Sequence, residues 1–222
     1  MGCCAVLDRF DAIVFDWDGT LLDSTAAIAA AIRRAAADLD LPDPGAERAS
    51  RVIGLGLAQA LSIAVPELPA GRAAEFTARY RVHYLAGEAR LQLFPHAREL
   101  VGALRARGCK LAIATGKTRA GLARALDSLG MAAQFDATRC ADETEPKPHP
   151  KMLQDLAGLL QTAPHRMMMV GDTTHDLQMA EAAGVAAVAV THGAHPASLL
   201  REAGPLALLD SLEELQRWLI RA

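Results

Sequence analysis

The sequence has few aromatic side chains, no surplus of basic charge and no long hydrophobic run. Phe, Trp and Tyr make up 4% of the 222 residues, too few for the stacking platforms that bind single-stranded nucleic acid. Lysine and arginine number 23 against 26 acidic residues, so the formal charge of −3 predicts no basic surface. No apolar run reaches the roughly 18 residues of a transmembrane helix. We therefore expect neither nucleic acid nor a membrane as a partner.

Cysteine is also sparse, with four residues, at positions 3, 4, 109 and 140. None of them forms a C-x-x-C pair, and their spacing matches no zinc-binding pattern. The first ten residues, MGCCAVLDRF, lack the charged start and the apolar stretch of a secretory signal. We interpret the cysteines as free thiols in a reducing compartment and predict a cytoplasmic location.

The remaining composition, 51% hydrophobic and 22% charged, is typical of a chain that folds around a core. Short continuous apolar runs predict strands buried on both faces, at 12–15, 110–114, 166–170 and 185–190. Helix-like segments occupy 95–107, 119–129, 150–160 and 176–183. Because strands and helices alternate, we predict an α/β fold with a Rossmann-like parallel sheet and right-handed crossovers.

One long segment interrupts this alternation. Far more residues separate Phe15 from Lys110 than one crossover requires. The intervening segment is rich in alanine and predicts helices at 25–39, 46–64 (interrupted near Gly54) and 70–86, the first capped by Ser24. We therefore predict a helical cap domain over 24–93, inserted into a core domain formed by 1–23 and 94–222.

Polar residues follow the first predicted strand. In open parallel sheets, ligands bind at the carboxyl ends of the strands. Alternate residues of an extended segment point the same way, so Asp16 and Asp18 can face one cavity, an arrangement that is costly without a cation or a proton. Gly19 lets the chain turn and Thr20 offers a hydroxyl. The alternative interpretation is an Asp-Gly turn with a solvated acid.

The next two candidates are a threonine and a lysine. Thr115 ends the second strand, with Lys117 close behind, and a hydroxyl with free amides at a helix start suits a phosphate oxygen. The alternative for Thr115 is a plain helix N-cap. Lys147 is held between Pro146 and Pro148, where its ammonium could neutralise phosphate charge. The alternative for Lys147 is a surface residue in a proline-rich loop.

The third strand end carries two further carboxylates. Asp172 lies at the tip of the strand, and Asp176 follows four residues later, at the start of a helix. This pattern predicts a metal-binding loop, whereas the alternative for Asp176 is an acid favoured by the helix dipole. We expect His175, between them, to face solvent.

In their order along the chain, these residues resemble the motifs of the haloacid dehalogenase superfamily. The resemblance covers nearly the whole chain and rests on Asp16-Trp17-Asp18-Gly19-Thr20, Thr115, Lys147 before Pro148, and Gly171-Asp172 with Asp176. Leu21-Leu22-Asp23-Ser24 resembles the entry into the cap in the phosphoglycolate phosphatase-like subgroup. Such a resemblance implies a core of the same superfamily fold with an inserted helical cap.

The resemblance also implies roles for these residues. Asp16 would be the nucleophile that forms an aspartyl-phosphate, and Asp18 would protonate the leaving group and then activate water. Thr115 and Lys147 would hold the phosphoryl group. These assignments imply a phosphatase acting on a small phosphorylated metabolite, either phosphoglycolate-like or a sugar phosphate.

A Mg²⁺ cofactor belongs to the same expectation. The resemblance implies that the Asp16 carboxylate, the Asp18 backbone carbonyl and Asp172 bind the ion, with Asp176 in support, either directly or from behind. Mg²⁺ prefers about six oxygen ligands and keeps several waters, which suits carboxylates in an open loop.

We expect three residues to contact the substrate: Thr20, Gly116 and Arg51. Gly116 stands where the subgroup often has Asn, which changes one hydrogen bond to the substrate. Arg51, in the cap loop 48–56, could pair with a substrate carboxylate. The alternative for Arg51 is a solvated helix face.

Two other functions compete with a phosphatase. A phosphomutase of the β-phosphoglucomutase type would need a histidine soon after the first motif and a lysine in the cap. Residues 24–34 contain no histidine and 24–93 contain no lysine. A non-catalytic binding protein on the same fold is the second alternative, which the intact set of acidic residues disfavours. We expect a monomer or a weak homodimer.

Overall fold

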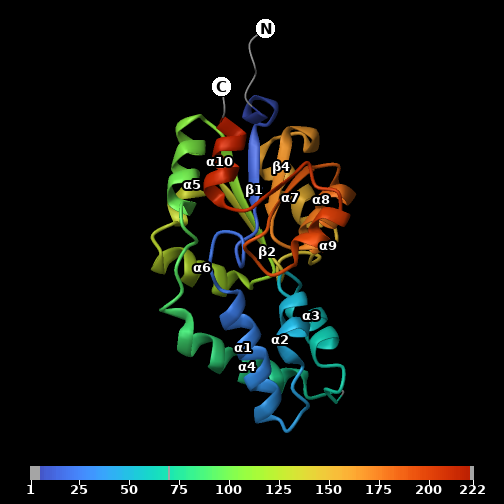
Figure 1. Ribbon diagram of the computed structural model, residues 1–222. Helices are drawn as coiled ribbons and strands as arrows, with labels where there is room; N and C mark the ends of the chain where they lie inside the picture. The colour runs from blue at the N-terminus through green and yellow to red at the C-terminus, as the bar shows by residue number, and fades with distance from the viewer. Residues whose placement is uncertain (1–5, 70, 221–222) are drawn as a thin grey trace.

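A computed structural model describes residues 6–69 and 71–220. One sheet of six parallel strands, in the order β3-β2-β1-β4-β5-β6, forms the centre of the core (Figure 1). The strands are β1 (Ala12–Phe15), β2 (Lys110–Thr115), β3 (Ala137–Cys140), β4 (Met167–Gly171), β5 (Ala186–Val190) and β6 (Ala207–Leu209). The parallel α/β fold is confirmed, with the four predicted strands in place. Strands β3 and β6 were not predicted.

Helices cover both faces of the sheet. Strand β1 is apolar throughout because its side chains are buried on both faces. Ile13 and Phe15 belong to the hydrophobic cluster on the side of α5 and α10. Ala12 and Val14 point the other way, into the cluster formed with α7 and α8. The core helices are α5 (Ala97–Ala106), α6 (Arg119–Ser128), α7 (Lys151–Leu160), α8 (Thr174–Ala183), α9 (Ala197–Glu202) and α10 (Leu212–Ile220). Of these, α9 and α10 were not predicted.

Four helices separate β1 from the rest of the core: α1 (Thr25–Asp38), α2 (Gly45–Arg51), α3 (Leu57–Ala64) and α4 (Ala73–Glu88). They surround a hydrophobic cluster of their own, which includes Ile32, Leu61 and Phe76. Figure 1 shows them gathered at one end of the molecule, where β1 leads into α1. The division of the chain into a cap at 24–93 and a core stays a prediction. We call these four helices the cap helices.

Two of the four cysteines lie in the described part of the chain. Cys109 and Cys140 are buried and free. Burial raises the pKa of the Cys109 thiol to about 11 and that of Cys140 to about 12, so both stay protonated at neutral pH. Cys3 and Cys4 lie outside the described residues. Within residues 6–69 and 71–220, no helix has both the length and the apolar character that crossing a bilayer requires.

Candidate active site

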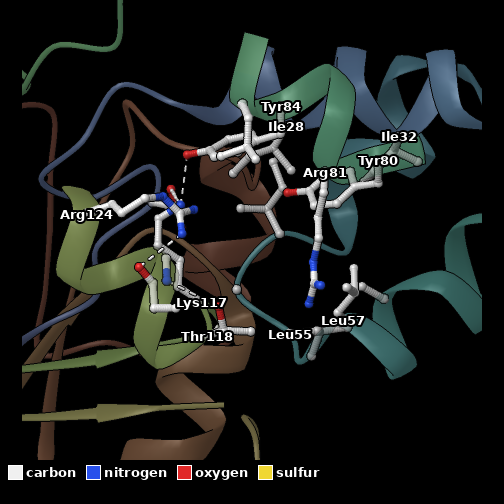
Figure 2. Close-up of a pocket in the computed structure, with 18 residues that line it drawn as sticks. Ile28, Ile32, Leu55, Leu57, Tyr80, Arg81, Tyr84, Lys117, Thr118 and Arg124 are labelled. Atoms are coloured by element: carbon white, nitrogen blue, oxygen red, sulfur yellow. Dashed lines mark hydrogen bonds and ion pairs between the residues drawn. The ribbon is translucent and has the colours of Figure 1, made fainter. Parts of the chain in front are cut away.

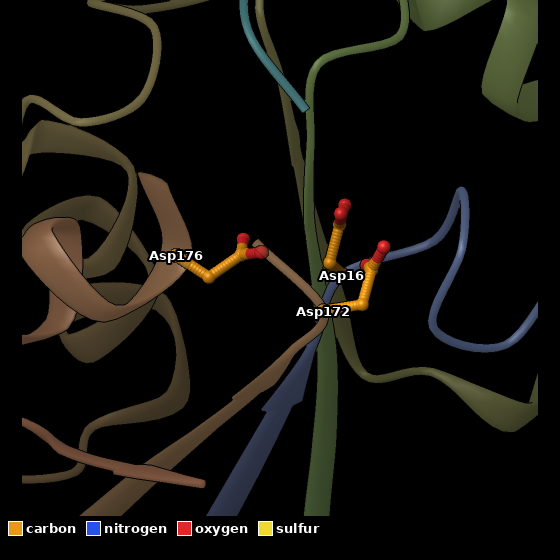
Figure 3. Close-up of side chains that lie close together, drawn as sticks. All are labelled: Asp16, Asp172 and Asp176. Carbon is orange, nitrogen blue, oxygen red and sulfur yellow. The ribbon is translucent and has the colours of Figure 1, made fainter. Parts of the chain in front are cut away.

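The strand order brings three of the predicted residues together. Because β2, β1 and β4 are neighbours in register, Asp16, Thr115 and Asp172 meet at the carboxyl edge of the sheet. All three are fully buried, as is Lys147. Figure 3 shows the carboxylates of Asp16 and Asp172 side by side, with that of Asp176 reaching toward them from α8.

Lys147 joins two of these carboxylates. Its Nζ lies 2.8 Å from Asp16 Oδ1 and 2.6 Å from Asp176 Oδ1. Burial alone would lower the pKa of the Lys147 ammonium, but the charges of Asp16 and Asp176 outweigh burial and raise it above the ordinary value. Lys147 therefore stays protonated, and its full burial rules out the surface alternative.

The two oxygens of Asp16 differ in their surroundings. Oδ1 accepts hydrogen bonds from the Trp17 backbone N–H at 2.7 Å and from Lys147. Oδ2 is buried and has no hydrogen-bond partner among the described residues. Burial raises the pKa of Asp16 well above its usual value, and the nearby charges of Asp172 and Asp176 raise it further. An unpaired buried carboxylate oxygen is costly, so it marks the place where a cation or a phosphorus atom would bind.

The residues present fit a divalent cation. Asp16, Asp172 and Asp176 each offer an oxygen, and these atoms lie within 4.8 Å of one another. Three carboxylates and one ammonium leave a net charge that a divalent ion would neutralise. Burial and the charge of Asp176 raise the pKa of Asp172 to about 7, another sign that positive charge is needed here. Hard oxygen ligands suit Mg²⁺.

Asp172 and Asp176 are held by different partners. Asp172 accepts hydrogen bonds from the Thr20 hydroxyl and the Ala194 N–H, each at 2.7 Å. Asp176 uses Oδ1 for Lys147 and Oδ2 for the N–H (3.1 Å) and hydroxyl (2.7 Å) of Thr173, completing a capping box at the start of α8. Each oxygen of Asp172 accepts one neutral hydrogen bond, whereas Asp176 gives one oxygen to an ammonium and the other to two donors, which favours a supporting role for Asp176 behind the ion.

Thr115 presents a hydroxyl rather than a helix cap. Its Oγ1 accepts the backbone N–H of Lys117 at 3.2 Å, so its own proton is free to be donated. Helix α6 is capped instead by Thr118, whose side chain accepts the Gly121 N–H at 3.3 Å. The N-cap alternative for Thr115 is therefore wrong.

Asp18 lies apart from the other carboxylates. Its Oδ1 accepts the Ser24 hydroxyl at 2.6 Å and lies 3.1 Å from Lys117 Nζ. The same ammonium donates to the Tyr84 hydroxyl at 2.8 Å, from cap helix α4. Ser24 occupies the predicted N-cap position of α1, but its side chain makes no cap hydrogen bond and donates to Asp18 instead. Neither the contact of Ser24 with Asp18 nor the contact of Tyr84 with Lys117 was predicted from the sequence.

Gly116 is the point where the cap loop between α2 and α3 touches the core. A Cβ built on Gly116 would lie 2.7 Å from the carbonyl oxygens of Gly54 and Leu55. Backbone therefore contacts backbone here, and the asparagine frequent in the resembling subgroup would not fit. Thr20, also predicted to contact substrate, directs its hydroxyl to Asp172.

The structure does not bring the Arg51 side chain to the site. Its guanidinium is exposed and pairs with Glu47 at 2.6 Å, which matches the alternative interpretation of a solvated helix face. The Arg51 carbonyl, however, lies 3.0 Å from Nε2 of both His175 and His195. His175 is half-buried and its Nε2 contacts this carbonyl, so the expectation that it faces solvent is met only in part. No sequence signal pointed to His195, since its partner is a distant backbone oxygen.

Comparisons with known proteins agree with the motifs. Residues 10–184 match the family model described as haloacid dehalogenase-like hydrolase. A protein named probable phosphatase IndB, from Dickeya dadantii strain 3937, is 35% identical, over 91% of this chain and 90% of its own. A phosphoglycolate phosphatase from Salmonella typhi is 32% identical, over 94% of this chain and 92% of its own.

The fold agrees as well. A crystal structure of a predicted phosphoglycolate phosphatase from Haemophilus somnus 129PT superposes with a TM-score of 0.83 at 26% identity, over 94% of this chain and 97% of its own. The resemblance inferred from the motifs is confirmed. Asp16, Asp172 and Asp176 lie together at the edge of a sheet that matches the fold of these relatives, and this protein is an enzyme of the haloacid dehalogenase-like hydrolase family.

Proposed function

We propose that this hydrolase is a Mg²⁺-dependent phosphatase that cleaves a small phosphomonoester through an aspartyl-phosphate on Asp16. The observation that supports this most strongly is the unpaired Oδ2 of Asp16. It is a buried carboxylate oxygen beside a fixed ammonium and two further carboxylates. Such an oxygen is a nucleophile whose charge is kept for a reaction partner rather than for a protein contact.

The first step transfers the phosphoryl group to the protein. Asp16 Oδ2 attacks phosphorus while Lys147 neutralises charge on the phosphoryl oxygens. The Thr115 hydroxyl donates to one of these oxygens. Asp16, the Asp18 backbone carbonyl and Asp172 would hold Mg²⁺, with Asp176 behind them. When bound, the ion supplies the positive charge that lets a carboxylate approach a phosphate dianion.

Asp18 manages the proton in both steps. In the first step its carboxyl donates a proton to the leaving oxygen as the P–O bond breaks. In the second it takes a proton from the water that attacks phosphorus and releases Asp16. Ser24 and Lys117 fix the position of Asp18 for this exchange. The loop that contacts Gly116 covers the site and excludes bulk water.

The names of the relatives suggest 2-phosphoglycolate as one candidate substrate. Sugar phosphates are the other class expected from the sequence. A cytoplasmic location and a monomeric or weakly dimeric state stay predictions.

The test is phosphate release from a panel of monoesters, measured with Mg²⁺ and with EDTA. The panel contains 2-phosphoglycolate, sugar phosphates, nucleotides and aryl and alkyl phosphates. We expect release that needs Mg²⁺ and is lost in Asp16→Asn. Asp23→Asn is the matched control, since Asp23 is an exposed acid of the same segment. Release that survives Asp16→Asn would refute the proposal. Isomerisation of a sugar phosphate without phosphate release would identify a mutase instead.

A further inference from the structure

A cavity of about 290 Å³ lies between the cap helices and the core, next to the site described above (Figure 2). Its walls come from α1 and α4, from the cap loop around Gly54, and from the segment that leads into α6. Its size is at the lower end of ligand-binding pockets.

The position of the cavity assigns it to one part of the substrate. Asp18, Gly116 and Lys117 form its inner end, whereas Asp16, Lys147 and Asp172 do not line it. If Asp18 protonates the leaving oxygen, as the proposed function holds, the cavity lies on the leaving-group side of the phosphorus atom. Its walls therefore select the alcohol that is released.

The walls are mainly apolar. Ile28 and Ile32 on α1 face Leu55 and Leu57 from the α2–α3 region. On α4, the rings of Tyr80 and Tyr84 stack with their centroids 5.9 Å apart. Apolar side chains around a cavity stabilise an apolar ligand in proportion to the area that they cover. A two-carbon leaving group such as glycolate would occupy only the inner end of the cavity, beside Asp18 and Lys117, and would leave most of this apolar surface uncovered.

Three cations line the cavity, and two of them already have partners. Lys117 pairs with Asp18 at 3.1 Å, and Arg124 pairs with Glu88 at 3.2 Å. Arg81, on α4, forms no ion pair with any residue in the described part of the chain. Figure 2 shows its side chain extending from α4 toward Leu55 and Leu57. Since Arg81 is exposed, it stands where the cavity reaches the surface.

We infer that the substrate is a phosphomonoester whose leaving group is a mainly apolar alcohol of ring size, with an anionic group at its far end that pairs with Arg81. This inference rests on the proposed function and narrows its substrate class. In the reaction, the P–O bond breaks, the alcohol oxygen takes a proton from Asp18, and water later restores Asp16 with release of phosphate. The ring occupies the apolar walls while the anion stays at the rim.

Three alkyl phosphates test the inference: 2-phosphoglycolate, benzyl phosphate and 4-carboxybenzyl phosphate. All three release an alcohol, so differences reflect the cavity more than the leaving-group chemistry. We expect kcat/KM for benzyl phosphate to exceed that for 2-phosphoglycolate by about 100-fold, because several apolar carbons become buried. 4-Carboxybenzyl phosphate should be better again, by about tenfold, through a charge-assisted pair with Arg81.

Arg81→Gln isolates the anion contact. We expect it to remove the advantage of 4-carboxybenzyl phosphate by raising KM about tenfold, and to leave benzyl phosphate unchanged. The matched control is Arg79→Gln, an exposed arginine of the same helix that does not line the cavity. Because Arg81 is exposed, the variant should fold normally, which its melting temperature would verify.

The outcomes separate this inference from the proposed function. If 2-phosphoglycolate is hydrolysed faster than both benzyl compounds in an Asp16-dependent reaction, the inference is overturned and the phosphatase proposal stands. If Arg81→Gln weakens both benzyl substrates equally, the anionic contact is overturned. If no compound of the full panel gives Asp16-dependent phosphate release, the proposed function falls, and the inference falls with it.

Discussion

The acidic site around Asp16, which we propose binds the phosphate, and the neighbouring cavity, which we propose holds the leaving group, lie side by side and have opposite character. We call them the phosphate site and the leaving-group cavity. The phosphate site consists of buried charged groups from the core, nearly all of which are already paired, as Lys147 is with Asp16 and Asp176. The cavity has apolar walls, mostly from the cap helices, with Arg81 as its unpaired cation in the described part of the chain. The phosphate site thus suits one chemical group, whereas the leaving-group cavity selects the shape and size of the leaving group. A hydrolase can keep its chemistry and change its substrate if only the second region varies.

The largest expected effect comes from Lys147→Met, which removes the ammonium group from the phosphate site. Removing one partner of a buried charge cluster leaves Asp16 and Asp176 unpaired, at a cost of about 3–5 kcal/mol in the free energy of unfolding. All substrates should lose kcat alike, because the lost charge faces the phosphoryl group that they share. Chemical denaturation and a substrate panel measure both effects. Lys151→Met, at an exposed lysine of α7, is the control.

If Lys147→Met lost activity toward only some substrates, the distinction between the two regions would be contradicted. It would mean that the phosphate site also senses the leaving group.

Gly116→Ala acts where the two regions meet. Its Cβ would lie 2.7 Å from two carbonyl oxygens of the cap loop, so the loop must move away. We expect kcat/KM to fall about 100-fold for every substrate, since the site would no longer be closed. Gly158→Ala on α7 is the matched control, because nothing lies within 4 Å of its added Cβ. Wild-type rates in Gly116→Ala would show that closure of this loop is not needed.

Ala60→Leu fills part of the second region. Ala60 lines the cavity and is buried, so the larger side chain takes space from the leaving group. We expect kcat/KM to fall about tenfold for benzyl phosphate and to stay unchanged for 2-phosphoglycolate. Kinetics with the two substrates on the same preparation provide the internal control. An equal loss for both would show that the variant disturbs the fold rather than the selection of size.

The proposed metal site predicts a pH dependence of stability. Burial raises the pKa of Asp172 from 3.8 to about 7, so the metal-free folded state holds a proton that the unfolded state has lost. Metal-free stability from this group therefore falls as pH rises between these values. Mg²⁺ at 100 times its Kd would stabilise the folded state by about 2.7 kcal/mol. Because the ion competes with the same proton, this stabilisation should be larger at the higher pH.

Thermal unfolding at about pH 5.5 and about pH 8, with Mg²⁺ and with EDTA, measures this dependence. The increase in melting temperature caused by Mg²⁺ should be larger at the higher pH. Asp172→Asn should abolish the difference. An equal increase at both pH values in the wild type would contradict the assignment of Asp172 to the metal.

The smallest effect is expected from Arg51→Ala. The guanidinium is exposed and pairs only with exposed Glu47, an interaction that contributes about 0–1 kcal/mol. We expect kcat/KM to change by less than about twofold for carboxylated substrates, in contrast to Arg81→Gln. A selective loss for carboxylated substrates would restore the role that the sequence suggested for Arg51.

The sequence predicted what local patterns encode. Strands β1, β2, β4 and β5 were recognised because burial on both faces makes them continuously apolar. Strand β3 carries Thr138 and Arg139 at the edge of the sheet and is only partly buried, so it has no such run. Strand β6 has three residues, too few for a recognisable pattern.

The residues of the site also differ in how far the sequence could predict them. Asp16, Thr115 and Asp172 could be predicted because parallel strands bring their carboxyl ends to one edge. Lys147 lies in a loop and Asp176 on α8, and both were predicted from their local sequence and from the family resemblance. The contacts of Asp18 could not, since Tyr84 reaches it from another helix through Lys117. Cavity walls made by the cap helices depend on how those helices pack against the core, which no periodicity in the sequence specifies.

The contact at Gly116 has a consequence for how such an enzyme can diversify. The cap loop meets the core there through bare main chain, with Gly54 and Leu55 presenting only carbonyl oxygens. This contact is made by main-chain atoms, so it does not depend on which side chains line the leaving-group cavity. Substitutions at Ile32, Leu57 or Arg81 can therefore change the shape of the leaving-group cavity while the cap loop stays in contact with Gly116. Gly116 therefore allows the substrate preference to change without loss of the contact that closes the site.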